Sequence, residues 1–442
     1  MHALLAKYAA KLAATGLCEP GDVLIAALDD ELAWSRAADG IGDAGDDPRR
    51  ALMKEIFAGM SISALLLARP SGAYQAAMTE LARQALADAG GNGPGSITPG
   101  DCETRTFLHD LPVVDSLSVD SLSAGGIIQA LRQRKGCVIF HEGETLVAAY
   151  GSVSPEQAYV TFSSMCFACF VAYFAGHLRT LRAGAMTDQR RAAFARVTAL
   201  LPRDRSDRPD LLPGPFADED AARAAMIQAG RHTVEYGLVD SYFGNISYLL
   251  PGSGPGKGSD IILISQTGSS LDELGACIDP CRMDGSSCAG LTASSEYSAH
   301  KAVYEAEQTT GATGTLTGGA RAILHGHPRF SVILSLDCAR LDCPKLGECH
   351  RACDTPRAVV DASGGMNIPI VPGEVGTGPF GLCNTLPQAL TSTSGEKRGA
   401  IVYGHGLFTL GAVDFRDAFA SLMDVEHFCR AEYFRRVAGL GG

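Results

Sequence analysis

The sequence predicts an α/β fold that occurs twice along the chain of 442 residues. In the second half, helical segments separate four strand-like apolar runs, at 259–266, 321–326, 368–372 and 399–403. Several segments of the first half align with these runs in the same order. Repeated order of this kind indicates a tandem duplication, and a chain of this length can hold two or three domains.

The repeat is diverged but collinear. KGCVIFHEGETLVAAYG, from Lys135, can be laid on RGAIVYGHGLFTLGA, from Arg398, with one small gap. Three upstream matches keep the same order: LPVV from Leu111 with IPIV from Ile368, SALLLARP from Ser63 with RAILHGHP from Arg321, and GDVLIAAL from Gly21 with SDIILISQ from Ser259. The alternative is two unrelated domains that share generic strand–turn–helix patterns.

Composition indicates a globular protein, with 46% hydrophobic residues and 51 glycines. A net charge of -12 argues against nucleic acid as a main partner. No signal peptide is recognisable, and the most apolar stretch, Met165 to Phe174, is too short for a membrane span and predicts a buried helix. The 14 cysteines are therefore expected to be reduced, in a cytoplasmic protein.

Four side chains of the second half could surround one metal ion: Glu296, His325, His327 and His405. His325 and His327 follow an apolar run, and residues two apart project from the same side of an extended strand. Three neutral imidazoles suit zinc, the most expected metal, or cobalt or manganese, and leave a coordination position open for substrate. The alternative is that these histidines are ordinary strand-end residues satisfied by hydrogen bonds.

Six motifs give residues 218–440 a resemblance to the class II aldolase/adducin family: GNIS, ILISQTG, SSEYSAH, HGHP, IPIV and YGHGLFTLG. The resemblance implies a three-layer α/β/α domain with a largely antiparallel central sheet. It also implies that the three histidines hold zinc and that Glu296 is the catalytic acid/base. Adducin-type members lack the full set of metal ligands, so the set in this chain favours an enzyme.

Five residues are implied by the resemblance to bind a substrate phosphate: Asn245, Thr267, Gly268, Ser294 and Ser295. Hydroxyls and backbone N–H groups near a helix N-terminus suit a phosphate or carboxylate, and Ser294 would also cap the following helix. His300, one helical turn after Glu296, would lie either behind the site or, as we favour, on the helix surface.

The expected activity is aldolase-type carbon–carbon cleavage of a small phosphorylated sugar or related hydroxy-carbonyl compound, through a metal-stabilised enediolate with Glu296 transferring the proton. Epimerases of the family usually carry aspartate at this position, so glutamate favours an aldolase. Epimerase, dehydratase or decarboxylase activity, or an adducin-like binding protein with a structural metal, remain alternatives.

The first copy lacks the metal ligands. Leu67 and Arg69 replace His325 and His327, and Glu142, preceded by His141, falls at the position of His405. We expect a degenerate aldolase-like domain over 1–200, a linker over 201–217 and a catalytic domain over 218–442. The resemblance implies rings of four subunits, and because each chain holds two fused copies, two chains would form the same ring as a homodimer. Arg69 and Arg132 of the first copy are then candidate anion-binding residues at the active site.

Two segments depart from the family pattern. A cysteine-rich insertion contains Cys338, Cys343, Cys349 and Cys353 with His350, and Cys277, Cys281 and Cys288 precede Glu296. Structural zinc, an iron–sulfur cluster, thiols and disulfides are all compatible with these spacings. The loop GEVGTGPFG, 373–381, lacks an acidic residue that the sugar-phosphate aldolases carry. The tyrosine that a neighbouring subunit supplies in those aldolases has no recognisable counterpart.

Overall fold

The chain forms two compact units, Met1–Arg203 (unit 1) and Asp204–Gly442 (unit 2). The structure is a computed structural model that describes residues 1–35, 47–90, 94–116, 124–141, 143–240, 242–252, 260–284, 293–310, 319–345, 349, 353, 357–361, 366–373, 376–392 and 399–441. Glu142, Cys288, His350 and part of the loop 373–381 lie outside the described residues.

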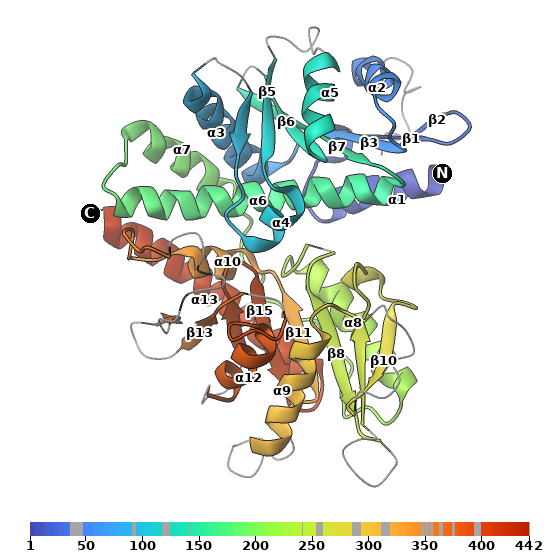
Figure 1. The fold of residues 1–442 in the computed structure, drawn as a ribbon, viewed down its shortest axis with the longest axis vertical. Helices are drawn as coiled ribbons and strands as arrows, with labels where there is room; N and C mark the ends of the chain where they lie inside the picture. Colours follow the sequence, from blue (N-terminus) through green and yellow to red (C-terminus); the bar gives the residue numbers. More distant parts are fainter. Residues whose placement is uncertain are drawn as a thin grey trace. The chain divides into compact units, whose positions relative to one another are not determined.

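Unit 1 is a sheet covered by helices on both faces (Figure 1). Its strands are β1 Val23–Leu28, β2 Leu32–Trp34, β3 Ala64–Ala68, β4 Gly95–Ile97, β5 Leu111–Ser116, β6 Gly136–His141 and β7 Glu144–Gly151. Its α-helices are α1 His2–Ala14, α2 Pro48–Gly59, α3 Gly72–Ala89, α4 Cys102–Leu108, α5 Ala124–Gln133, α6 Pro155–Arg182 and α7 Asp188–Ala199. The strand order is β2-β1-β3-β7-β6-β5-β4.

The core of unit 1 explains why its strands are apolar on both sides. Helices α2 and α5 cover one face, where Met53, Ile56 and Ile127 pack against Leu65 and Leu67. On the other side, α6 contacts β7, α1 and α3. Helix α6 is long and apolar enough to cross a membrane, but 83% of its most apolar window is buried. This confirms the predicted buried helix.

Unit 2 contains the residues of the predicted metal site. Its strands are β8 Asn245–Leu250, β9 Ile261–Ser265, β10 Ile278–Arg282, β11 Ala322–Gly326, β12 Arg357–Val360, β13 Asn367–Val371, β14 Gly399–Val402 and β15 Gly406–Gly411. Its α-helices include α8 Glu219–Glu235, α9 Tyr297–Thr310, α10 Arg329–Leu336, α12 Leu382–Ser392 and α13 Phe415–Gly441. The strand order is β10-β9-β8-β11-β15-β14-β13-β12.

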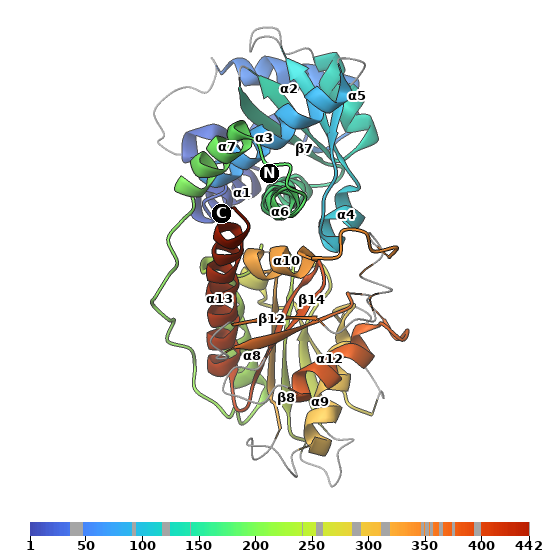
Figure 2. The ribbon, with the colours of Figure 1, turned by 90° about the vertical axis from the view of Figure 1, so that its left-hand side faces the viewer.

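The sheet of unit 2 is the middle layer of three. Helices α9 and α12 pack together on one face, through Val303, Tyr304 and Leu386 against Ile323 and Phe408. Helices α8, α10 and α13 lie on the other face (Figure 2). Apart from β13 with β14, the paired strands in the described part of unit 2 are antiparallel. The predicted three-layer α/β/α fold with a largely antiparallel sheet is confirmed.

The two sheets share strand order and register. Without β10, the order of unit 2 repeats that of unit 1, and β5–β6 is parallel as β13–β14 is. Leu67 pairs with Ala148 where His325 pairs with Phe408, in agreement with the aligned segments SALLLARP and RAILHGHP. The tandem repeat predicted from the sequence therefore appears as two sheets of the same construction.

One of the four sequence matches is wrong. The sequence predicts that GDVLIAAL is equivalent to SDIILISQ, which forms β9. The strand it forms, β1, lies beside β3, and the strand in this position of unit 2 is β8, beside β11. Leu24 therefore takes the place of Asn245, because both pair with the residue at the His325 position. Apolar runs of similar composition in neighbouring strands explain the misalignment.

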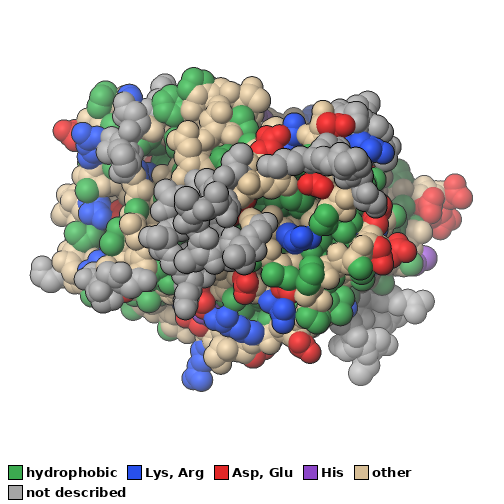
Figure 3. Space-filling model, turned by 90° about the horizontal axis from the view of Figure 1, so that it is seen from below, with side chains coloured by type: hydrophobic (Ala, Val, Ile, Leu, Met, Phe, Trp, Pro, Cys, Tyr) green, Lys and Arg blue, Asp and Glu red, His purple; other side chains and the backbone are tan. Residues whose placement is uncertain are grey.

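The predicted linker has no helix or strand, but it is held against unit 2. Arg208 donates to Asp424 at 2.8 Å, and the backbone N–H of Gly214 donates to Asp414 at 2.8 Å. Leu211 is 4% exposed. The boundaries between the linker, 201–217, and the two predicted domains remain a prediction. In the view of Figure 3, basic and acidic side chains of the described residues are interspersed with apolar ones.

Candidate metal centre

Strand β11 presents the first two histidines. Its apolar residues Ala322, Ile323 and Leu324 are fully buried, and pairing with β8 and β15 places it inside the sheet. His325 lies within the strand and is 0% exposed, while His327 follows the strand end and is 2% exposed. Burial of two imidazoles at one strand end indicates a built site rather than a solvated edge.

His405 comes from the turn between β14 and β15 and is 4% exposed. Gly404 in this turn has a φ of 58°, a conformation that favours glycine. A Cβ atom at Gly406 would lie 2.4 Å from the carbonyl oxygen of Gly326 and 2.6 Å from Cε1 of His325. The absence of a side chain at position 406 therefore lets the turn approach the other two histidines.

The three imidazoles face one another. Their ligand atoms all lie within 4.8 Å of one another, and Nε2 of His325 is 3.1 Å from Nε2 of His327. Two nitrogens bound to one tetrahedral zinc would be about 3.3 Å apart. Nδ1 of His325 lies 3.1 Å from the carbonyl oxygen of Leu407, which can only accept, so the ring proton is on Nδ1. The lone pair on Nε2 therefore points into the cluster.

Burial keeps the rings of His325 and His327 neutral at pH 7. It lowers the pKa of His325 to about 3 and the pKa of His327 well below its ordinary value. Neutral imidazoles with inward lone pairs are the form in which histidine binds a divalent metal. The donors therefore fit a zinc, cobalt or manganese ion.

Glu296 completes the cluster from the residue before α9. Its Oε1 lies 3.1 Å from Nε2 of His405, and its Oε2 lies 3.6 Å from Nε2 of His325. The carboxylate is 4% exposed. Burial opposes its charge, but the imidazoles of His325 and His405 and the amide of Asn245 hold the pKa of Glu296 below its ordinary value. Glu296 is a carboxylate at neutral pH.

A buried chain of hydrogen bonds, which we call the Asn245–Tyr304 chain, supports Glu296. The amide of Asn245 donates to Oε2 of Glu296 at 2.6 Å, so its oxygen faces Nε2 of His300 at 2.5 Å. Because burial lowers the pKa of His300 to about 4, the neutral ring donates from Nε2 and accepts on Nδ1 from Ser247, at 2.7 Å. Tyr304 lies 2.8 Å from Ser247. The donors of Asn245, His300 and Ser247 thus point toward the Glu296 carboxylate, while the Tyr304 hydroxyl also lies 3.2 Å from the carbonyl oxygen of Arg321, to which it can donate.

The favoured surface position for His300 is wrong. The ring is 0% exposed because Glu296, His300 and Tyr304 share the side of α9 that faces β8, and Asn245 and Ser247 on β8 satisfy both ring nitrogens. The alternative position behind the site is the one the structure has. Helical spacing correctly placed His300 on the same face as Glu296 but did not distinguish a buried face from an exposed one.

The sequence of residues 224–433 matches the family described as class II aldolase and adducin N-terminal domain. The second unit belongs to the class II aldolase/adducin family. Among solved structures, L-fuculose-1-phosphate aldolase from Thermus thermophilus matches 49% of this chain and 96% of its own, at 22% identity and a TM-score of 0.35. A sugar-phosphate aldolase from Thermotoga maritima matches 50% and 97%, at 16% identity and a TM-score of 0.34. No curated protein sequence gave a match.

Some of the predicted anion-binding residues of the aldolase/adducin unit lie close together, and others do not. The backbone N–H of Ser295 donates to Thr267 at 3.0 Å, and Thr267, Gly268 and Ser295 are exposed together. Ser294 is 7% exposed, and its hydroxyl accepts from the backbone N–H of Glu296 at 3.3 Å, the predicted capping role. Asn245 instead places its amide between Glu296 and His300. Phosphate binding by these five residues stays a prediction.

The cysteines of the insertion are not gathered into a ligand set. Among the described residues, the three histidines form the one group of three or more side chains able to hold an ion. Cys338, Cys343, Cys349 and Cys353 are thiols and are not part of such a group. The thirteen cysteines that the structure describes form no disulfide.

The arginines proposed for unit 1 are already engaged. Arg69 donates to Asp22 and Glu144 at 3.1 Å each, and Arg132 donates to the carbonyl oxygen of Gly59 at 3.0 Å. Two carboxylates on Arg69 reduce its capacity to bind a further anion. Its position in the sheet, equivalent to His327, carries an ion pair in place of a metal ligand.

Sequence inspection missed two aromatic neighbours of the histidines. Phe408 stacks on His325 with ring centroids 3.9 Å apart, and Phe243 stacks on His327 at 5.3 Å. Phe408 pairs with His325 across β11 and β15, so the register would have indicated it. Phe243 precedes GNIS in a loop, where no periodic signal exists. Both rings fix imidazole orientation and exclude water.

Proposed function

We propose that the aldolase/adducin unit is a metal-dependent lyase that cleaves a carbon–carbon bond in a small phosphorylated sugar or related hydroxy-carbonyl compound. The observation that carries the proposal is the buried carboxylate of Glu296 beside three buried histidines. A purely structural metal site needs no acid/base within 3.1 Å of a ligand, and this arrangement favours an enzyme over an adducin-like binding protein.

His325, His327 and His405 would hold the metal. When bound, a divalent metal supplies Lewis-acid polarisation of a substrate oxygen and stabilises the negative charge that develops as the bond breaks. Glu296 moves the proton at Oε1, because Oε2 is occupied by the amide of Asn245. Phe243 and Phe408 limit water at the rings. The exposed Thr267, Gly268 and Ser295 would orient the anionic end of the substrate.

Elemental analysis tests the metal site first. Purified wild-type protein should contain about one zinc, cobalt or manganese ion per chain, and His325→Ala/His327→Ala should lose it. The matched control is His232→Ala/His427→Ala, which changes two histidines of the same unit outside the cluster and should keep the ion. Unchanged stoichiometry in the cluster variant would place the metal elsewhere and end the catalytic proposal.

A product screen then separates the reactions. Phosphorylated ketoses incubated with the metal-loaded wild type should give two carbonyl fragments, and Glu296→Gln should keep its metal and lose turnover by at least about a hundredfold. A product of unchanged mass would indicate epimerisation, loss of water a dehydratase, and release of carbon dioxide a decarboxylase. Metal binding without turnover of any substrate would favour the binding protein.

A further inference from the structure

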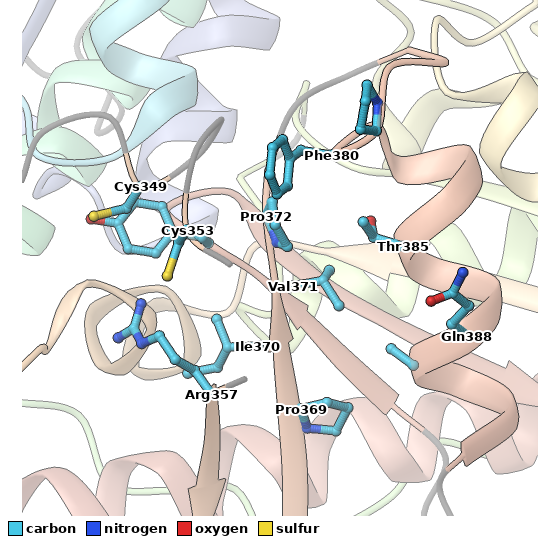
Figure 4. A pocket seen from close by; sticks show the side chains of 13 residues that line it. Cys349, Cys353, Arg357, Pro369, Ile370, Val371, Pro372, Phe380, Thr385 and Gln388 are labelled. Atoms are coloured by element: carbon cyan, nitrogen blue, oxygen red, sulfur yellow. The ribbon is translucent and has the colours of Figure 1, made fainter. Parts of the chain in front are cut away.

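A pocket of about 410 Å³ in unit 2 lies at the end of strand β13, and none of the metal-site residues lines it. Its volume is in the range of small-molecule sites. The wall consists of side chains from β12, β13, α12, the 376–381 loop and the cysteine-rich insertion (Figure 4). These elements come together because β12 and α12 both flank β13.

The two segments that depart from the family pattern both line this pocket. Cys349 and Cys353 come from the cysteine-rich insertion, and Pro379 and Phe380 come from the loop that lacks the acidic residue. Arg357 follows the insertion directly as the first residue of β12. The two segments thus contribute side chains to one shared surface.

Arg357 is the cation of the pocket. One of its N–H groups donates to the carbonyl oxygen of Asp337 at 2.7 Å, and its guanidinium lies 5.4 Å from the ring centre of Tyr403. The carboxylate of Asp337 instead binds Arg436 at 2.8 Å. No carboxylate in the described part of the chain pairs with Arg357. Its remaining N–H donors, arranged as a planar fork, are suited to a carboxylate.

The rest of the wall defines the body of the ligand. Ile370, Pro372 and Phe380 are partly exposed apolar side chains in the pocket. Figure 4 shows Arg357 with the two cysteines on one side of β13, and Thr385 and Gln388 of α12 on the other. A phosphate dianion would need more than one cation in such apolar surroundings. A single guanidinium beside apolar walls fits one carboxylate on a hydrophobic body.

We propose that the Arg357 pocket binds a small organic monocarboxylate, with the carboxylate on Arg357 and the apolar body against Ile370, Pro372 and Phe380. Tyr403 links this pocket to the metal centre, because it stands two residues before His405 in the same turn and its N–H donates to Val371 at 2.9 Å. The carboxylate belongs either to the substrate itself or to a separate ligand. Its binding does not depend on the proposed lyase reaction.

Calorimetric titration with benzoate and benzamide tests the charge requirement. Benzoate should bind wild type at least tenfold more tightly than benzamide, which has the same shape without the charge. Arg357→Met should weaken benzoate at least tenfold and leave benzamide unchanged. Arg282→Met is the matched control, an exposed arginine on the opposite edge strand β10, and should bind benzoate as wild type does.

A second readout guards against a misfolded variant. Benzoate should slow the alkylation of Cys353 by N-ethylmaleimide in wild type, relative to Cys338, which does not line the pocket. Peptide mass spectrometry measures both rates. Arg357→Lys keeps the charge but loses the fork, so it should retain partial protection. Equal binding of benzoate and benzamide, or unaltered binding in a folded Arg357→Met, would overturn the proposal.

The metal-site variant identifies the source of the carboxylate. If His325→Ala/His327→Ala binds benzoate with wild-type affinity, the pocket serves a ligand independent of the metal. If the affinity for benzoate falls in this variant, while benzoate binding to wild type still requires Arg357, the carboxylate belongs to a substrate that reaches both the Arg357 pocket and the three histidines. Either result supports the Arg357 pocket, and neither depends on whether the lyase reaction occurs.

Discussion

At the scale of single residues, the orientation of Glu296 depends on partners that never reach the substrate. His300 holds the oxygen of the Asn245 amide, so the N–H group of that amide faces Oε2 of Glu296. This leaves Oε1 toward the histidines. Since a neutral ring can donate from one nitrogen while accepting on the other, His300 is a positioning residue rather than a catalytic one.

Replacing His300 by phenylalanine should therefore lower kcat by on the order of tenfold with little change in KM. The amide of Asn245 would lose its fixed orientation, but the substrate contacts would remain. Tyr304→Phe, at the far end of the Asn245–Tyr304 chain, is the control and should cost about twofold or less. Steady-state kinetics with the metal content measured in parallel decides the point. Equal losses for both variants would indicate only a general structural role.

The neutral state of His300 also predicts a pH effect on stability. Its pKa is about 4 in the folded protein because of burial, while the ordinary value is 6.5. Between these values the unfolded chain binds a proton that the folded protein does not, so stability falls as pH drops from 6.5 to 4. The contribution of this one residue is on the order of 3 kcal/mol.

Urea unfolding of metal-free protein at several pH values from 4 to 7 measures this effect. Metal-free His300→Phe should lose less stability over the window than wild type, although it starts from a lower value. His325 and His327 act in the same direction in both proteins, since burial lowers the pKa of each. Parallel pH curves for the two proteins would show that His300 does not titrate as stated.

At the scale of elements, the three histidines come together because β11 and the β14–β15 turn approach closely. The contact is made by Gly326 and Gly406, and a Cβ atom at position 406 would also lie 2.8 Å from Cδ2 of His327. The backbone atoms of β11 and β15 cannot move apart without breaking the sheet pairing of Gly326 with Leu407. The turn therefore tolerates only glycine here.

Gly406→Ala should therefore disrupt the cluster, with at least tenfold weaker metal binding and a free energy of unfolding lowered by about 1–3 kcal/mol. Gly439→Ala is the matched control, because a Cβ atom there meets nothing within 4 Å and alanine favours the helix. Metal titration and urea unfolding of both variants provide the measurement. Wild-type metal affinity in Gly406→Ala would contradict the close approach.

At the scale of the whole molecule, two sheets of the same order carry different residues at equivalent positions. Unit 2 has His325 where unit 1 has the fully buried Leu67, and His327 where unit 1 has Arg69 in an ion pair. In unit 1, a core residue and an ion pair at the surface therefore occupy the positions of two candidate metal ligands. A domain that keeps its fold without a metal site can serve assembly or complete a neighbouring site.

Two chains of this protein should therefore form a particle with four aldolase-like units. The family resemblance implies a ring of four subunits, and each chain supplies two units with the same strand order. Size-exclusion chromatography with light scattering should give about twice the mass of 46.2 kDa. A monomer that turns over substrate would contradict the predicted dimer. A tetramer of chains would also contradict it and would indicate a particle with eight units.

Much of the fold and the site followed from the sequence alone. Apolar strand runs and repeated segment order predicted the α/β fold and its duplication, because burial imposes local periodicity that the chain must carry. The order of the motifs identified four candidate site residues, Glu296, His325, His327 and His405. Each of them stands next to a glycine, a helix cap or a strand end, and these features are recognisable in the local sequence.

Only the tertiary structure decided what surrounds them. The burial of His300, the place of β1 beside β3, and the pocket around Arg357 depend on which strands pair and which helix covers them. The four cysteines of the insertion are close in sequence but form no common site among the described residues. Neighbouring residues determine which helix, strand or turn a short segment can form. Contacts between distant segments depend on tertiary packing, which no local sequence pattern specifies.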